Sequence, residues 1–439
     1  MMIELRQPDA LLKKLLPPQK LQPDTVYVPS QFSLTFVHNG HHYIFNTLTK
    51  QCVNAELPEQ CRAGEGFDDL IRNRFLVPQG KDECAFYQSV STMLRAYSHK
   101  NGVKSYTILP TLCCNARCFY CYEEGCQSLT MTQETVEQTI RYIIDSHVGD
   151  KVKLTWFGGE PLLRADIIDR ICEGLREAGI DFKSTMISNG SLITPAIVEK
   201  MTGAWNLQYI QISTDGDEQE YVRRKRYITD DNQYRKVLSA IDMMSSRDIT
   251  VAVRCNIDEG NIDSIPAFAD DLASTIHNRD KVLLYLSPLF DVRSGDNAMQ
   301  FWEKVIAARS QIAASGIHVY NIIGFSGSFR VNHCMADSGA VVICPDGVLS
   351  PCEHLQQAAA FGDIWRGVTD ESARREFCRT DRIREKCRKC TFLPECTGFA
   401  SCPIYDADCA KLRRMMIIDS LKRRIDKKET YFDGDIPLC

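Results

Sequence analysis

The chain has 439 residues, of which 44% are hydrophobic and 25% are charged, as in an ordinary globular protein of about two to four domains. Its net charge of -5 excludes a general electrostatic attraction to nucleic acid or to anionic lipid, so we expect no nucleic-acid partner and no membrane partner. No run of residues approaches the ~18 apolar positions that span a bilayer, and the N-terminal residues show no signal-peptide core, so we expect a cytoplasmic protein.

Cysteine is the unusual component, with 20 residues of this type. Disulfides are rare in a reducing cytosol, so clustered thiols there more often bind metal or take part in chemistry. One group lies within residues 113–126, and another runs from residue 334 to residue 409. The distribution therefore predicts metal-binding or reactive thiols in two separate parts of the chain.

Residues 1–102 are expected to form a small α+β module. The stretch FSLTFVHNGHHYIFN reads as two strands joined by a turn at Asn39 and Gly40, which is a strong hairpin signal. The elements expected after the hairpin are a helix near 67–73, a strand at 74–78 and a helix at 82–99. No catalytic constellation is visible in this module, so a binding or a structural role is predicted for it.

Between residues 103 and 325, apolar segments alternate with amphipathic helices. Strands are expected at 106–112, 152–159, 183–190, 207–214, 251–258 and 281–290. In the first helix, Val136, Ile140, Ile143 and Ile144 share one face, and Thr132 is the expected N-cap. Six such units predict an α/β fold with a parallel sheet, either doubly wound or curled into a barrel. In both, functional residues lie at the carboxyl ends of the strands.

The regular alternation stops at about residue 326. Residues 326–439 are rich in cysteine and in loops, and they contain a final helix expected at 409–426. We therefore expect a third, loop-dominated domain at the C-terminal end.

Cys114, Cys118 and Cys121 are spaced C-x3-C-x2-C directly after the first strand of the alternating region. A [4Fe–4S] cluster normally takes four thiolates, so three ligands from one loop would leave one iron open. An open metal position is typical of a catalytic rather than a structural site. A zinc site and a cluster completed by Cys126 are the alternatives.

The same stretch, CNARCFYCY, resembles the cluster loop of the radical S-adenosylmethionine (radical SAM) enzymes. In that family the open iron is chelated by the amino and carboxylate groups of SAM, and a partial (β/α)6 barrel carries the site. The resemblance therefore implies SAM and a [4Fe–4S] cluster as cofactors, and a partial barrel for residues 103–325.

Three further motifs resemble the strand ends that contact SAM in this family. WFGGEP follows the second strand, ISNG ends the third and ISTDG ends the fourth. Gly158 and Gly159 would bring the backbone close to SAM, and Glu160 would take its amino group. The full set of residues implied in SAM binding is Gly158, Gly159, Glu160, Ser188, Asn189, Ser213 and Asp215.

One motif departs from the family pattern. Where the family often has His-Asp before an arginine, this chain has Tyr221 and Val222 followed by RRKR at 223–226. An arginine of this run could bind the SAM carboxylate, and a solvated basic turn is the alternative.

The C-terminal cysteines resemble the SPASM extension of radical SAM enzymes, which carries two auxiliary [4Fe–4S] clusters. The ligands implied for one cluster are Cys387, Cys390, Cys396 and Cys409, and those for the other are Cys334, Cys352 and Cys402. Either Cys344 is the fourth ligand of the second cluster, or that cluster has an open site. Five residues separate Cys396 from Cys402, where the family favours three. Two zinc sites are the alternative for this region.

The resemblance also implies a function. Reductive cleavage of SAM would release a 5′-deoxyadenosyl radical that abstracts hydrogen from a substrate. We predict a peptide-modifying oxidoreductase that cross-links a ribosomally made precursor peptide, with residues 1–102 recognising the peptide and a flavodoxin or ferredoxin supplying low-potential electrons. No catalytic residue is assigned beyond the cluster. The alternatives are a sulfatase-type maturase that oxidises a cysteine or serine to an aldehyde, and a non-catalytic iron–sulfur electron carrier.

Overall fold

The computed structural model describes most of the chain. The residues described are 2–3, 10–98, 103–123, 128–149, 151–229, 231–289, 298–320, 339–377, 383–395 and 410–426. They fall into two compact units. The N-terminal unit contains the described residues of 2–98 and 383–426, and the barrel unit contains those of 103–320 and 339–377.

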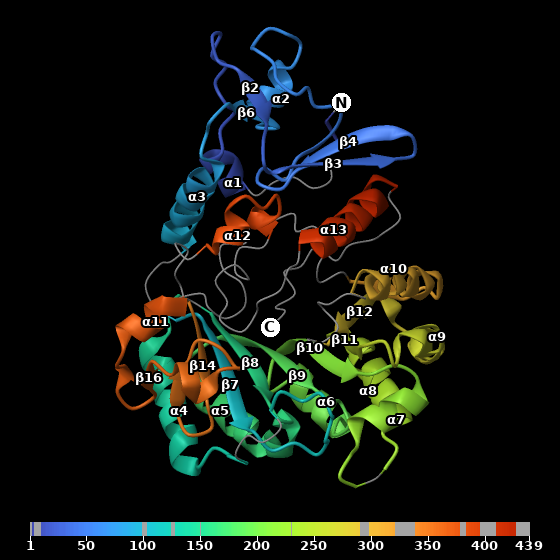
Figure 1. Ribbon diagram of the computed structural model, residues 1–439. Helices are drawn as coiled ribbons and strands as arrows, with labels where there is room; N and C mark the ends of the chain where they lie inside the picture. Colours follow the sequence, from blue (N-terminus) through green and yellow to red (C-terminus); the bar gives the residue numbers. More distant parts are fainter. Residues whose placement is uncertain are drawn as a thin grey trace. The chain divides into compact units, whose positions relative to one another are not determined.

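The N-terminal unit contains two small antiparallel sheets (Figure 1). The four-stranded sheet has the order β1 (Met2–Ile3), β5 (Cys52–Asn54), β4 (His41–Asn46) and β3 (Ser33–His38), and β2 (Tyr27–Pro29) pairs with β6 (Leu76–Pro78). The helices are α1 (Ala10–Leu15), α2 (Asp68–Arg72), α3 (Glu83–Ser98), α12 (Glu385–Arg388) and α13 (Ala410–Ile425). The predicted hairpin is confirmed, with Asn39 and Gly40 at φ 49° and 77° between β3 and β4. Both angles lie in the left-handed region that an Asn-Gly turn adopts readily.

The core of the N-terminal unit joins distant parts of the chain. Phe36 of β3 and Phe45 of β4 pack in one hydrophobic cluster with Phe392 and with Ile417 and Leu421 of α13. The structure thus groups residues 383–426 with the first hundred residues, and residues 339–377 with the barrel. The division into domains 1–102, 103–325 and 326–439 stays a prediction, because compact units and sequence domains need not coincide.

The barrel unit is built on one mixed sheet of eleven strands, ordered β13-β12-β11-β10-β9-β8-β7-β14-β15-β16-β17. The strands are β7 (Ser105–Thr111), β8 (Val152–Gly158), β9 (Phe182–Ser188), β10 (Leu207–Thr214), β11 (Thr250–Ile257), β12 (Val282–Pro288), β13 (His318–Val319), β14 (Ala340–Ile343), β15 (Val348–Ser350), β16 (Gly362–Asp363) and β17 (Gly367–Val368). The six predicted strands are β7 to β12, which are parallel neighbours in sequence order. β14 extends the sheet in parallel beside β7, and β15 to β17 continue it as antiparallel strands.

The helices of this unit cover the six parallel strands. They are α4 (Gln133–Ser146), α5 (Ala165–Glu177), α6 (Pro195–Thr202), α7 (Glu218–Lys225), α8 (Tyr234–Ser245), α9 (Ile265–Thr275), α10 (Ala298–Ala314) and α11 (Glu371–Phe377). The Thr132 hydroxyl accepts the Thr135 amide at 3.1 Å, as expected of an N-cap, and Val136, Ile140 and Ile143 are buried. The prediction of a partial (β/α)6 barrel with an α/β architecture is therefore confirmed.

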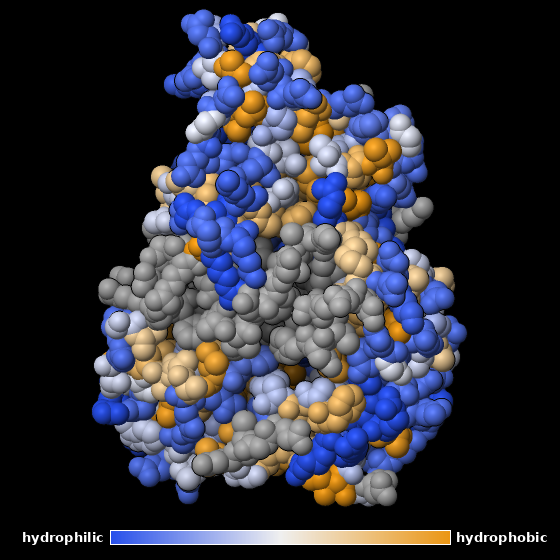
Figure 2. Space-filling view, in the orientation of Figure 1, coloured by the Kyte–Doolittle hydropathy of each residue, from blue (hydrophilic) through white to orange (hydrophobic). Residues whose placement is uncertain are grey.

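Among the described helices, none is long and apolar enough to cross a bilayer. On the face shown in Figure 2, hydrophobic residues lie in small groups among hydrophilic ones.

Candidate active site

The predicted cluster loop follows β7, at the carboxyl ends of the parallel strands. Cys114, Cys118 and Cys121 are all half-buried and carry free thiols. The loop is anchored to the C-terminal end of α7 (Glu218–Lys225) and to the residues that follow it, because the Arg117 amide donates to the Lys225 carbonyl at 3.0 Å. The Ile228 amide donates to the Asn115 carbonyl at 2.9 Å in the same way. The sheet therefore presents the three thiols at its functional edge.

The three thiols lie close enough to affect one another. Burial raises the pKa of the Cys114 thiol to about 11, and Cys118 contributes to the raised pKa values of Cys114 and Cys121. Among the described residues, no three Cys, His, Asp or Glu side chains converge on the position of a single metal ion. Each thiolate of a cubane cluster binds a different iron, so a [4Fe–4S] cluster does not require the three thiols to converge on one point. Cys126 lies outside the described residues.

The two glycines of WFGGEP let the end of β8 approach the start of the cluster loop. Gly158 has φ +113°, and a Cβ atom there would lie 2.3 Å from the Thr111 carbonyl oxygen. A Cβ atom on Gly159 would lie 2.3 Å from the Cys113 carbonyl oxygen. Instead, the Gly159 amide donates to Thr111 at 3.1 Å and the Glu160 amide donates to Cys113 at 2.9 Å. Glycine is required here because backbone packs directly on backbone.

Glu160 is buried within a network formed by the predicted SAM-binding residues themselves. Its carboxylate accepts from the Ser188 hydroxyl at 2.9 Å, from the Asn189 amide at 2.8 Å and from the Leu162 amide at 3.1 Å. Burial raises the pKa of Glu160 to about 7, although these donors oppose the shift. A carboxylate has about four acceptor positions, so Glu160 keeps capacity for one further donor.

Asn115 connects this network to the cluster loop. It is not among the site residues predicted from the sequence. The Asn189 side-chain amide donates to the Asn115 side-chain oxygen at 2.8 Å, and Asn115 donates to the Ser191 hydroxyl at 2.9 Å. Asn189 also approaches the Cys114 sulfur at 3.9 Å. A polar amide between two predicted ligands was the only signal for it in the sequence.

Asp215 is fully buried among groups that the sequence analysis did not connect. The Tyr120 hydroxyl donates to one carboxylate oxygen at 2.5 Å, and the Lys225 ammonium lies 3.2 Å from the other. Lys225 and the side chain of Asn256 donate to the Tyr120 oxygen at 3.3 and 3.2 Å. Burial lowers the pKa of Lys225, but Asp215 and Tyr120 raise it well above its usual range overall. Lys225 is therefore a fixed positive charge under the cluster loop.

The run RRKR is not a solvated turn. Arg224 is buried and binds Asp258 through two nitrogens, at 3.1 and 2.8 Å, while its guanidinium lies 4.9 Å above the ring of Phe119. Lys225 is buried as well, whereas Arg223 and Arg226 are exposed. Two buried cations therefore lie beside Asp215, because the Arg224 Nε atom is 3.8 Å from the Asp215 carboxylate and the Lys225 ammonium is 3.2 Å from it. That an arginine of this run meets the SAM carboxylate stays a prediction.

A second group of side chains meets the cluster loop from beyond β15. The ring of His354 lies 4.0 Å, centroid to centroid, from the ring of Tyr122. Burial and the neighbouring Glu353 raise the pKa of Glu123 to about 7. The segment that carries Cys352 is thus close to the first cluster loop, which no local motif indicated.

The predicted SAM-binding residue Ser213 is half-buried at the end of β10. It stands in register with Arg254 of β11.

The predicted auxiliary ligands are placed only in part. Cys352 lies in the barrel unit and is nearly buried, and Cys387 and Cys390 are half-buried in the N-terminal unit. Cys344 is 1% exposed and packs with Leu109 and Val342, and burial raises its pKa to about 12. The assignment of Cys344 as a fourth ligand stays a prediction. The other predicted ligands lie outside the described residues: Cys334, Cys396, Cys402 and Cys409.

Sequence comparison identifies a family model within the barrel unit. Residues 108–272 match the Radical SAM superfamily. The AdoMet-dependent heme synthase of Methanosarcina barkeri (strain Fusaro / DSM 804) is 22% identical over 318 residues, which are 65% of this chain and 87% of that protein. The probable GTP 3′,8-cyclase of Thermococcus kodakarensis is 31% identical over 164 residues, 36% of this chain and 50% of that protein.

Two solved structures share the fold. Native anSMEcpe with bound AdoMet matches with a TM-score of 0.59 and 15% identity, covering 74% of this chain and 98% of that one. Streptococcus suis SuiB bound to S-adenosylmethionine matches with a TM-score of 0.50 and 14% identity, covering 87% of this chain and 97% of that one. At these identities the likeness concerns the fold alone.

Proposed function

We propose that the chain is a radical SAM enzyme that modifies a ribosomally made precursor peptide by forming a cross-link, and the match of residues 108–272 to the Radical SAM superfamily supports this. The observation that carries the proposal is the loop of three free thiols at the carboxyl end of β7. Polar residues at the ends of β8 to β10 lie beside this loop and are buried, as a small polar cofactor requires; they are Glu160, Ser188, Asn189 and Asp215.

Cys114, Cys118 and Cys121 would hold the SAM-binding [4Fe–4S] cluster. When bound there, the cluster and SAM would supply the radical hydrogen-abstracting chemistry of this superfamily. The residues proposed to line SAM remain Gly158, Gly159, Glu160, Ser188, Asn189, Ser213 and Asp215. Glu160 is already bound by three internal donors, so in this proposal its remaining acceptor position meets the SAM amino group.

Lys225 is the cation that we assign to this site. Burial raises the pKa values of Cys114, Cys121 and Glu160, and the charge of Lys225 opposes each rise, so its field reaches both the thiols and the proposed SAM pocket. A buried ammonium in this position would balance the thiolates and the carboxylate of SAM.

The N-terminal unit offers a surface for the peptide. A cavity of about 560 Å³ is lined by apolar Val53, Leu57 and Phe67 and by acidic Glu56 and Asp69. Such a cavity can take an apolar side chain of a peptide that carries basic residues beside it. A structure of native anSMEcpe holds AdoMet and the Cp18Cys peptide, at a TM-score of 0.55 and 15% identity to this chain, which supports a peptide substrate by analogy.

Two auxiliary [4Fe–4S] clusters complete the proposal, with Cys387, Cys390, Cys396 and Cys409 for one and Cys334, Cys352 and Cys402 for the other. They would accept the electron left after peptide oxidation, and a flavodoxin or ferredoxin would supply the electron that starts the reaction. Three clusters correspond to about 12 irons per chain. An iron count near four would refute the auxiliary clusters and leave the first site intact.

The decisive experiment mixes anaerobically reconstituted protein with SAM and dithionite. We expect 5′-deoxyadenosine from the wild type and none from Cys118→Ala. Cys113→Ala is the matched control, because this half-buried thiol is adjacent in sequence but is not a predicted ligand. An electron carrier would make no 5′-deoxyadenosine, and this outcome would end the proposal.

A second experiment tests the peptide and the product. The substrate is a precursor peptide encoded beside the gene, and mass spectrometry of the product measures the change. A cross-link removes two hydrogens without creating an aldehyde. A sulfatase-type maturase would instead leave an aldehyde that reacts with a hydrazide probe. Leu57→Lys should slow peptide modification and leave 5′-deoxyadenosine formation without peptide unchanged. Val37→Lys, at an exposed position of β3, is the control.

A further inference from the structure

The segment that carries Cys387 and Cys390 is built into the N-terminal unit. We propose that Thr47 and Lys50, in the turn between β4 and β5, position this segment, so that the N-terminal module forms part of one auxiliary cluster site. The inference rests on the proposed function in one respect, namely that these two cysteines hold a cluster. It assigns residues 1–98 a role that differs from peptide binding.

Lys50 is the strongest contact. Its ammonium lies 2.5 Å from a carboxylate oxygen of Glu395, and the two side chains are 1% and 2% exposed. Lysine and glutamate are almost never buried to this extent without a partner. Because removing one member leaves an uncompensated buried charge, the pair fixes where Glu395 lies. Glu395 directly precedes Cys396, which is a predicted ligand of the same cluster.

The turn that presents Lys50 is itself held in place. Lys50 has φ +61°, and its amide donates to the Asn46 carbonyl at 2.8 Å. The side-chain oxygen of Asn46 accepts the amides of Leu48 and Thr49, each at 3.0 Å. The Asn46 side-chain amide donates to the Arg74 carbonyl at 2.8 Å. A rigid turn can therefore act as a template for the segment that packs on it.

Two further hydrogen bonds reach the segment from Cys387 to Glu395. The Thr47 hydroxyl donates to the Thr391 carbonyl at 2.5 Å, and the Gln31 side-chain amide donates to the Arg388 carbonyl at 3.1 Å. The segment is thus held at 388, 391 and 395 by residues of the module.

The cysteines also contact the core of the module. Cys387 packs against the hydrophobic cluster of Phe32, Leu48, Tyr87 and Leu393, and Cys390 packs against the cluster of Leu34 and Phe45. Removing a group that orients a metal ligand commonly lowers the affinity for the metal by about 10–100-fold. Module residues in these positions should therefore control how firmly the cluster is held.

The test uses the full chain, reconstituted anaerobically. Lys50→Met should lose about four of about 12 irons, while the first cluster still cleaves SAM to 5′-deoxyadenosine. Lys20→Met, at an exposed lysine of the same module, should keep the wild-type iron count.

Thr47→Val keeps the inference testable if Lys50→Met does not fold, because valine has nearly the shape of threonine and only the hydroxyl is lost. In this variant a chelator should remove about a third of the iron roughly tenfold faster than from the wild type. Wild-type iron counts and release rates in both variants would overturn the inference, and so would an equal loss from all clusters. A wild-type protein with only about four irons would instead overturn the auxiliary clusters of the proposed function, and this inference with them.

Discussion

Lys225 shows how one residue acquires a role from its surroundings. Within RRKR it is one basic residue among four, yet the fold buries it against Asp215 and Tyr120 under the thiol loop. Arg224, its neighbour, binds Asp258 at 2.8 Å and also lies 3.8 Å from Asp215. The two buried cations thus share Asp215, and Lys225 is the closer of them.

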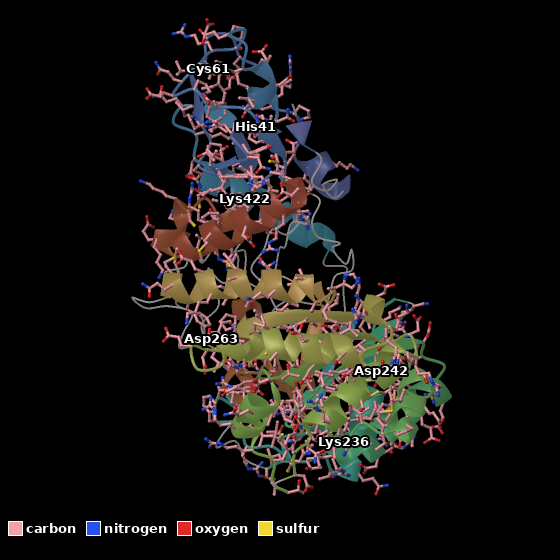
Figure 3. The ribbon with its side chains drawn as sticks, turned by 90° about the vertical axis from the view of Figure 1, so that its right-hand side faces the viewer. His41, Cys61, Lys236, Asp242, Asp263 and Lys422 are labelled. Atoms are coloured by element: carbon pink, nitrogen blue, oxygen red, sulfur yellow. The ribbon has the colours of Figure 1, made fainter. Side chains whose placement is uncertain are left out.

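Replacing Lys225 with methionine should therefore damage the site. The buried Asp215 carboxylate would lose its closer cation and keep Arg224 at 3.8 Å, and we expect a loss of about 3 kcal/mol in the free energy of unfolding together with weaker SAM binding. Lys225→Arg should recover part of both, because it keeps the charge. Lys236→Met, at an exposed position of α8 labelled in Figure 3, should leave both unchanged. Urea unfolding and equilibrium SAM binding measure the two effects, and a stable, SAM-binding Lys225→Met variant would contradict the assignment.

Glu160 should make the stability of the apoprotein depend on pH. Its pKa is raised from 4.5 to about 7, so between these values the native state keeps a proton that the unfolded chain has released. Stability therefore falls as the pH rises through this window, by at most about 3 kcal/mol. Glu160→Gln cannot titrate, so the free energy of unfolding of the wild type relative to this variant should decrease between about pH 5 and about pH 8.

Urea unfolding of both proteins at the two pH values measures this difference. Glu199→Gln, at an exposed position of α6, should follow the wild-type profile. A constant difference between wild type and Glu160→Gln would show that Glu160 stays ionised throughout.

At the scale of elements, the contact between β8 and the loop after β7 decides the geometry of the thiols. Gly159→Ala would place a Cβ atom 2.3 Å from the Cys113 carbonyl oxygen, so the loop must move. We expect this variant to fold but to lose the first cluster, with about four fewer irons per chain. Gly179→Ala is the control, because Gly179 has φ +74° with no atom near its Cβ position and should cost only about 1 kcal/mol of backbone strain.

Iron analysis and 5′-deoxyadenosine formation check the prediction. A Gly159→Ala protein with a full iron count and normal SAM cleavage would show that the loop tolerates the displacement.

The hairpin of β14 and β15 has a similar constraint. Gly347 has φ +82°, and an added Cβ atom would lie 2.4 Å from the Trp365 ring. Gly347→Ala should therefore destabilise the barrel unit by more than the ~1 kcal/mol of backbone strain alone. Gly367→Ala, at φ +74° with nothing within 4 Å, should show only that backbone cost. Thermal unfolding compares the two variants, and equal losses would refute the steric argument.

At the scale of the whole molecule, the chain forms two units with separate cores. Units with their own cores commonly unfold separately, so we expect two thermal transitions in the apoprotein. Lys50→Met should lower only the transition of the N-terminal unit, and Lys225→Met only that of the barrel unit. Calorimetry tests this, and a single transition that both variants shift equally would indicate one cooperative molecule.

The sequence by itself determined the features that depend on local spacing. The C-x3-C-x2-C loop, the Asn39-Gly40 hairpin, the Thr132 cap and six alternating strand–helix units follow from turn preference and side-chain periodicity, which involve residues close together in the chain. These features were enough to predict the partial barrel and the radical SAM family.

Only the tertiary structure decided which distant residues share a core or a charge. It buried Cys344 among apolar side chains, buried Arg224 and Lys225 while leaving Arg223 and Arg226 exposed, and packed α13 against β3 and β4. Burial and ion pairing depend on the whole packing arrangement, because a cysteine or a lysine has the same local signature in a core, at a metal site or on the surface. The contact between Lys50 and Glu395, which are 345 positions apart, exists only once both ends of the chain have folded together.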